Sequence, residues 1–167
     1  DTFKNIKIII SGSESLFIRK KSRESLAGRI YEFQVKNLNF KEYLNFKNKK
    51  FDKFEIYKKE LLEEFKNFII CNGFPEIINE TKEDSAKYIK ENVIERIIYR
   101  DIPQIVKIKD PAILEQIFKI ILYSPGEIIN MIDLAKDLGI ARQTVSTYLD
   151  YLEKSYLVKN SIITRET

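Results

Sequence analysis

The chain has 167 residues, 44% hydrophobic and 32% charged, so it can build a core and is not expected to be disordered. It has no histidine and one cysteine, Cys71, which excludes histidine-based catalytic triads, zinc or histidine metal sites and an internal disulfide. The net charge of +4 permits nucleic-acid binding without requiring it. No apolar run reaches the roughly 18–20 residues of a membrane-spanning helix, and the first residues do not have the pattern of a signal peptide. We therefore expect a cytoplasmic protein with no membrane partner and no metal site.

The first 38 residues contain a short β-branched run at residues 6–10, which is closed by Ser11-Gly12-Ser13. This pattern predicts a buried strand that ends in a turn of small residues. A strand needs a partner, so it either pairs with residues 31–35 or belongs to a sheet that lies upstream of the chain. A short helix is predicted over residues 15–27 and ends at Gly28.

Residues 39–109 have a helical pattern. Asn39 is a candidate N-cap for a short helix that begins at Phe40. Apolar side chains at three- and four-residue spacing predict a helix over residues 54–70, which Gly73-Phe74-Pro75 interrupts. A longer amphipathic helix is predicted over residues 83–101. Apolar stripes of this kind are typical of a hydrophobic core.

Residues 110–167 have the spacing of a helix-turn-helix module followed by a wing. Asp110 is a candidate cap with Pro111 at the first helical position, and Gly139 stands where the tight turn needs it. Three helices and two short strands are predicted, over residues 112–123, 132–138 and 142–154 and over residues 128–130 and 156–158. The apolar positions expected to close the three-helix core are Leu134, Leu138, Ile140, Val145, Leu149 and Leu152.

One face of the third helix of this module is polar. Its side chains are of the types that read base edges or contact phosphates in a major groove of DNA. The candidate DNA-binding residues are Arg142, Gln143, Ser146 and Thr147. Asp150 and Glu153 on the same helix oppose a phosphate-facing role, and Ala141 stands where a capping hydroxyl is usual. The module is therefore either a binder of duplex DNA or a packing and protein-contact domain.

Two stretches of the chain resemble one family. Ser11-Gly12-Ser13 after its strand, Ser25-Leu26-Ala27-Gly28-Arg29 and the helix after Asn39 are similar to the second half of the AAA-type ATPase core common in archaea. Cys71-Asn72-Gly73-Phe74-Pro75-Glu76, Tyr99-Arg100-Asp101-Ile102-Pro103 and the helix-turn-helix run resemble the domain of unknown function that usually follows this core. We therefore expect a mainly α fold with minor β structure. Its parts are the remnant of a P-loop ATPase sheet in residues 1–38, a helical lid in residues 39–109 and a winged-helix domain in residues 110–167.

The resemblance implies ATP hydrolysis coupled to conformational change in an intact parent protein. Ser11 or Ser13 would correspond to the sensor-1 position, and Arg29 to an arginine that stabilises charge on the transferred phosphoryl group. The phosphate-binding loop and the acidic metal-binding strand of the family are missing. ATP and Mg²⁺ are thus expected as cofactors of the parent and not of this chain alone, which we do not expect to hydrolyse ATP. The chain is expected to be truncated at both ends, at its C-terminal end within the wing.

Three functions stay open on this basis. The chain is a C-terminal fragment of an AAA-type ATPase, a stand-alone winged-helix DNA-binding protein such as a regulator, or a non-catalytic interaction subunit. Its partner in the last case is a second copy or the missing ATPase core. The predicted strand at residues 6–10 favours the ATPase fragment, because a lone strand leaves its backbone groups unpaired whereas an edge strand of a larger sheet does not.

Overall fold

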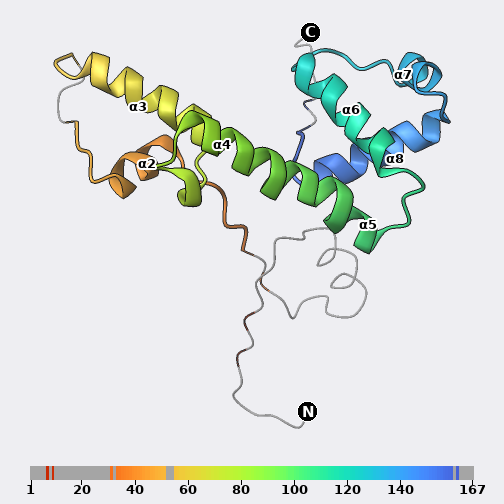
Figure 1. Ribbon diagram of the computed structural model, residues 1–167, viewed down its shortest axis with the longest axis horizontal. Helices are drawn as coiled ribbons and strands as arrows, with labels where there is room; N and C mark the ends of the chain where they lie inside the picture. The colour runs from red at the N-terminus through yellow and green to blue at the C-terminus, as the bar shows by residue number, and fades with distance from the viewer. Residues whose placement is uncertain are drawn as a thin grey trace. The chain divides into compact units, whose positions relative to one another are not determined.

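The computed structural model describes residues 7, 9, 31, 33–51, 55–159 and 161, and these residues contain helices but no strands (Figure 1). The prediction of a mainly helical fold is confirmed. The chain divides into two compact units. We call Tyr31–Arg96 the central unit, and we call the unit of Asp1–Ile30 and Ile97–Thr167 the C-terminal unit after its described helices. The predicted strand at residues 6–10 and the predicted helix at residues 15–27 lie almost wholly outside the described residues.

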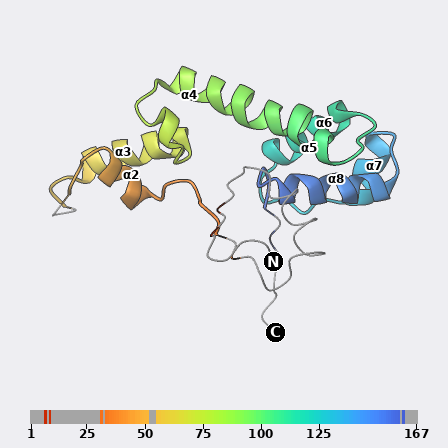
Figure 2. The ribbon, with the colours of Figure 1, turned by 90° about the horizontal axis from the view of Figure 1, so that it is seen from below.

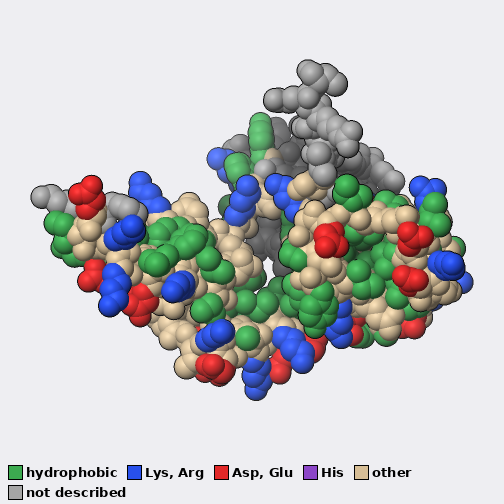
Figure 3. Space-filling view, turned by 90° about the horizontal axis from the view of Figure 1, so that it is seen from above, with side chains coloured by type: hydrophobic (Ala, Val, Ile, Leu, Met, Phe, Trp, Pro, Cys, Tyr) green, Lys and Arg blue, Asp and Glu red, His purple; other side chains and the backbone are tan. Residues whose placement is uncertain are grey.

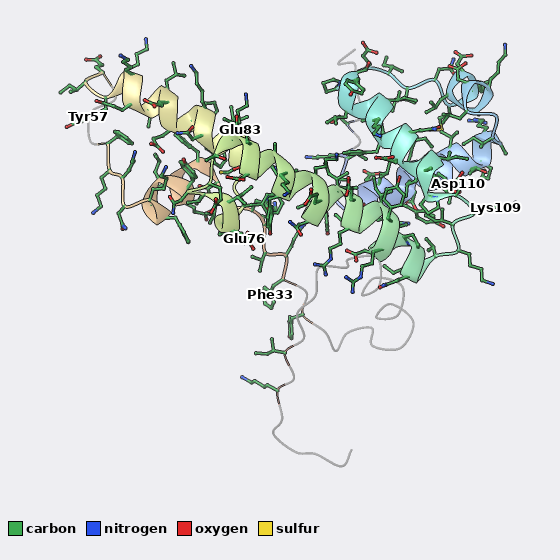
Figure 4. All side chains as sticks on the ribbon, viewed as in Figure 1. Phe33, Tyr57, Glu76, Glu83, Lys109 and Asp110 are labelled. Atoms are coloured by element: carbon green, nitrogen blue, oxygen red, sulfur yellow. The ribbon has the colours of Figure 1, made fainter. Side chains whose placement is uncertain are left out.

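The described elements of the central unit are α2 (Phe40–Phe46), α3 (Lys58–Cys71), η1 (Pro75–Ile77), α4 (Lys82–Tyr88) and η2 (Ile89–Glu95). The predicted cap at Asn39 is confirmed, because its side chain accepts a hydrogen bond from the Glu42 amide at 3.0 Å. The Glu42 carboxylate in turn accepts from the Asn39 amide at 2.8 Å, which completes a capping box. The predicted helix at 54–70 is present, but it begins at Lys58, just after Tyr57 (Figure 4).

Asn72 and Gly73 end α3, with φ angles of 49° and 68° in the left-handed region. This region costs glycine little, because glycine has no Cβ. The predicted break at Gly73-Phe74-Pro75 is therefore confirmed, and Pro75 starts the short helix η1.

The core of the central unit joins α2 to α3 and η1. Its buried members are Tyr43, Cys71, Ile77 and Ile78, and Phe40, Leu44, Phe68, Phe74 and Tyr88 are among the partly buried side chains packed against them. Cys71 is 3% exposed, and its thiol donates a weak hydrogen bond to the carbonyl oxygen of Phe68 at 3.4 Å. Cys71 therefore behaves as a small buried hydrophobic residue.

The described elements of the C-terminal unit are η3 (Ile97–Asp101), α5 (Ile102–Ile105), α6 (Pro111–Tyr123), α7 (Met131–Asp137) and α8 (Arg142–Lys154). Both α6 and α7 pack against α8 (Figure 2). The predicted cap at Asp110 is confirmed by its hydrogen bond from the Ala112 amide at 2.9 Å, and Asp110 stands directly before α6 (Figure 4). η2 and η3, which fall within the long helix predicted over residues 83–101, are both π-helical.

The turn between α7 and α8 has the predicted glycine. Gly139 has a φ of 64°, and the amide of Ile140 donates to the carbonyl oxygen of Ala135 at 3.0 Å, which closes the end of α7. α8 has the predicted bounds. Val145 and Leu152 on α8 are fully buried, with Leu114 and Ile117 of α6 also buried. Of the six positions expected in the core, Leu134, Val145 and Leu152 are buried, and Leu138, Ile140 and Leu149 are half-buried.

The two short strands predicted beside these helices are not formed. Residues 128–130 and 156–158 are not in strands. Asn130 instead caps α7, and its side chain accepts from the Ile132 amide at 3.0 Å. Tyr156 has a φ of 62°, and the Leu157 amide donates back to the carbonyl oxygen of Leu152 at 3.1 Å, so this segment closes the end of α8. The described residues therefore show the three helices of the module without a wing.

Candidate functional site

The predicted ATPase residues Ser11, Ser13 and Arg29 lie outside the described residues. Their roles as sensor and charge-stabilising arginine stay predictions. Among the residues that the structure does describe, no group of three or more cysteine, aspartate and glutamate side chains could hold a metal ion. None of the described helices is both long enough and apolar enough to cross a membrane.

The predicted DNA-binding residues lie on the first two turns of α8. Arg142 and Gln143 are exposed, whereas Ser146 and Thr147 are half-buried. Arg142, Gln143 and Ser146 line one shallow hollow together with Met131 at the start of α7. The hydroxyl of Thr147 donates to the carbonyl oxygen of Gln143 at 2.8 Å, so it is bound to its own helix. The structure thus brings three of the four residues to one surface, and Thr147 is the weakest of the candidates.

The charges around this face are mixed. Asp150, whose charge opposes a phosphate-facing role, forms an ion pair with Lys154 one turn later on α8. Ala141 precedes α8 without a side-chain hydrogen bond to the helix, as its side chain predicted. Acidic and basic side chains are interspersed on the molecular face seen in Figure 3. Among the four candidate residues on α8, Arg142 alone carries a charge.

A buried charged group lies elsewhere, in the central unit, between α2 and α3. The Glu64 carboxylate on α3 is 6% exposed and accepts a hydrogen bond from the Tyr43 hydroxyl at 2.9 Å. Lys47 contributes its ammonium at 3.3 Å, and Lys49 forms a second ion pair with the same carboxylate. We call Tyr43, Lys47, Lys49 and Glu64 the Glu64 cluster.

The Glu64 cluster alters the ionisation of its acidic members. Burial alone disfavours the charged carboxylate, but the hydrogen bonds from Lys49, Tyr43 and Lys47 outweigh burial and hold the pKa of Glu64 below its ordinary value. Burial, followed by the hydrogen bond to Glu64 and its charge, raises the pKa of the Tyr43 hydroxyl. Glu64 is thus ionised and Tyr43 neutral at pH 7. This arrangement ties α3 to α2 and to Lys49 just after it, and its carboxylate is buried.

The sequence analysis assigned no role to the members of the Glu64 cluster. The signal was the spacing. Glu64 follows Leu61 by three residues and precedes Phe68 by four, which places its side chain on the inward face of α3.

Comparisons with known proteins identify the family. A family model described as "Domain of unknown function (DUF8612)" matches residues 62–162, and a model described as "AAA domain" matches residues 1–44. The first match covers more than half of the chain, so the protein belongs to the DUF8612 family. The second match supports the resemblance to AAA-type ATPases for the first 44 residues only.

Two relatives extend over most of the chain. An uncharacterized protein of Methanocaldococcus jannaschii is 34% identical over 160 residues, which are 90% of this chain and 36% of the relative. An uncharacterized protein of Haemophilus influenzae is 27% identical over 158 residues, which are 92% of this chain and 38% of the relative. The chain therefore spans little more than a third of the length of these relatives. No solved structure matches the chain.

Proposed function

We propose that this chain is part of an AAA-type ATPase, in which residues 1–44 complete the nucleotide site and the DUF8612 domain is moved by ATP hydrolysis. The observation that carries the proposal is the order of the two matches, with the AAA domain over residues 1–44 and DUF8612 over residues 62–162. About 62–64% of each relative's length lies outside the part that this chain matches, which leaves room there for a phosphate-binding loop.

The role that we assign to this chain in the nucleotide site follows from the groups that its residues contain and the groups that they lack. Its five glycines form no phosphate-binding loop, and its described residues hold no acidic cluster for Mg²⁺. We therefore do not assign ATP and Mg²⁺ to this chain by itself. The contribution we assign to this chain is Ser11 or Ser13 near the γ-phosphate and Arg29 against the charge on the phosphoryl group.

The test is ATP hydrolysis by the intact protein with Arg29→Ala. We expect turnover to fall by orders of magnitude, while nucleotide binding, measured separately by titration, stays close to that of the wild type. Arg23→Ala removes the same charge six residues earlier and is the matched control. Unchanged turnover in Arg29→Ala would remove Arg29 from the site, and absence of hydrolysis in the wild-type protein would refute the proposal.

Duplex DNA is the partner that we propose for the helix-turn-helix part of the DUF8612 domain. The observation that favours it is the exposure of Arg142 and Gln143 on the first turn of α8, directly after the Gly139 turn. In helix-turn-helix proteins the first turn of the recognition helix contacts the bases. A protein partner on the same face is the alternative, in which case the domain serves as an interaction subunit.

Fluorescence anisotropy of labelled duplex DNA, repeated at several salt concentrations, separates these two partners. Arg142→Ala and Gln143→Ala should each weaken binding by about 1–3 kcal/mol, and binding should fall steeply as salt rises. Lys119→Ala on α6 removes one positive charge that does not line the hollow at Arg142, and it should change binding little. Salt-independent binding, or equal effects of Arg142→Ala and Lys119→Ala, would favour the protein partner.

A further inference from the structure

We infer that residues 37–44 are a rigid joint, built into the helices of the DUF8612 domain although they form the end of the AAA match. The joint transmits movement of the ATPase core to the central unit, a role that rests on the proposed function. Two sets of contacts carry the inference. One is a backbone lock at Gly73, and the other is the side-chain packing of α2 on α3.

The backbone lock lies where residues 37 and 38 meet the end of α3. The Leu38 amide donates to the carbonyl oxygen of Gly73 at 2.9 Å, and the Asn37 side-chain amide donates to the carbonyl oxygen of Asn72 at 2.9 Å. A Cβ added to Gly73 would lie 2.3 Å from the Leu38 carbonyl oxygen, a separation that real Cβ atoms do not show. Because that neighbour is backbone, no side-chain rotation can relieve the overlap. Gly73 is therefore required for the close approach of the two segments as well as for its positive φ.

The side-chain packing extends the lock over the length of α2. Tyr43 is fully buried, and its ring centroid lies 5.5 Å from that of Phe68 on α3. The Phe40 ring lies 5.1 Å from Phe65 and 5.4 Å from Phe68. Glu64 then ties the Tyr43 hydroxyl and Lys47, at the end of α2, to the middle of α3. A tether that only linked two domains would be exposed and would make few contacts of this kind.

These contacts show that the segments packed onto the helices of the DUF8612 domain begin before the start of its sequence match. The family match begins at residue 62, but α3 of that match is covered by α2, which belongs mostly to the AAA match. A displacement of residues 1–36 by ATP hydrolysis would therefore pull on α2 and move α3 with it. It would not be absorbed by a flexible linker at residues 37–44.

The first test is hydrogen exchange of the full chain, followed by mass spectrometry of peptides that cover residues 37–46. Gly73→Ala should raise their exchange at least about tenfold over the wild type. Gly139→Ala is the matched control, since Gly139 has a similar φ of 64° but nothing within 4 Å of an added Cβ. It introduces the same backbone strain without the overlap and should leave residues 37–46 protected. Asn37→Ala is a second variant, in case Gly73→Ala does not fold, and should raise exchange about threefold.

The second test uses the intact protein with ATP. Gly73→Ala should hydrolyse ATP close to the wild-type rate but lose any ATP-dependent change in the exchange of α3 and α4. Fast exchange of residues 37–46 in the wild-type chain, or equal effects of Gly73→Ala and Gly139→Ala, would overturn the joint. An ATP-dependent change that survives in Gly73→Ala would overturn its transmitting role. If the intact wild-type protein hydrolyses no ATP, the proposed function fails, and the exchange data still decide whether the joint exists.

Discussion

Replacing Glu64 by glutamine tests whether the Glu64 cluster stabilises the central unit. The substitution keeps the shape of the side chain and leaves an oxygen to accept the Tyr43 hydroxyl, but it removes the charge that faces Lys47 and Lys49. The Lys47 side chain is 19% exposed and that of Lys49 is 43% exposed, so solvent recovers part of the lost energy, more for Lys49. Hydrogen bonds to charged groups are worth about 1.5–3 kcal/mol each. With that discount we expect the central unit to lose about 2 kcal/mol.

The loss should depend on pH in a defined direction. The folded pKa of Glu64 is below its ordinary value of 4.5, so the charged form is favoured by folding. Its contribution to stability is therefore fully present above about pH 4.5 and disappears as the pH falls through the folded pKa. The difference in stability between wild type and Glu64→Gln should be constant between about pH 6 and pH 8, because Glu64 is ionised throughout this interval. The difference should shrink towards zero in acid, where Glu64 becomes protonated.

The measurement is urea denaturation at each pH. Hydrogen exchange of α3 peptides serves as the readout, so that unfolding of the central unit is recorded separately from that of the C-terminal unit. Glu63→Gln is the matched control, because Glu63 is the preceding residue on the same helix and is exposed. It should change stability by less than about 0.5 kcal/mol. A destabilisation that stays the same from neutral pH to acid, or equal effects of the two substitutions, would refute the assignment of the effect to the buried charge.

Two further predictions concern the C-terminal unit. Leu152→Ala removes a fully buried side chain from α8 and should cost about 2–5 kcal/mol in urea denaturation, whereas Leu122→Ala, at a position 58% exposed, should cost less than about 0.5 kcal/mol. Asn130→Ala removes the cap of α7 and should cost about 1 kcal/mol, seen as faster exchange of α7 amides, while Asn92→Ala on η2 should leave them unchanged. Equal effects within either pair would show that burial or capping is not the cause.

Local signals predicted several caps and turns of the described helices. Asn39, Asp110 and Gly139 each satisfy a backbone group at a helix end, and that requirement involves only a few neighbouring residues. Such features can be inferred from a single sequence because all of their partners are close in the chain. The bounds of α8 followed from the same kind of evidence, a glycine turn before the helix and an apolar stripe along it.

Features that depend on distant residues were not predicted. The Glu64 charge is buried with partners that lie far earlier in the chain: Tyr43, 21 residues earlier, donates a hydrogen bond, and Lys47 and Lys49, 17 and 15 residues earlier, supply the opposite charge. The segment at residues 156–158 has the β-branched and aromatic composition of a strand, but its amides bond back to the end of α8, and the described residues contain no strand that could pair with it. The roles of Ser11, Ser13 and Arg29 stay predictions for a different reason, since they lie outside the described residues and would act on a nucleotide held by other parts of the protein.

The two family matches and the two compact units divide the chain at different places, and the contacts explain the difference. The DUF8612 match runs from residue 62 to residue 162, whereas the central unit begins at Tyr31 and ends at Arg96. Without α2, the inward face of α3 would expose Phe68 and leave the Glu64 carboxylate without the Tyr43 hydroxyl. An apolar face left in contact with water costs free energy, so α3 requires a segment that sequence similarity assigns to another family. The end of the AAA match is therefore part of the folding unit of the DUF8612 domain. A change that destabilises α2 should destabilise α3 before it destabilises α8.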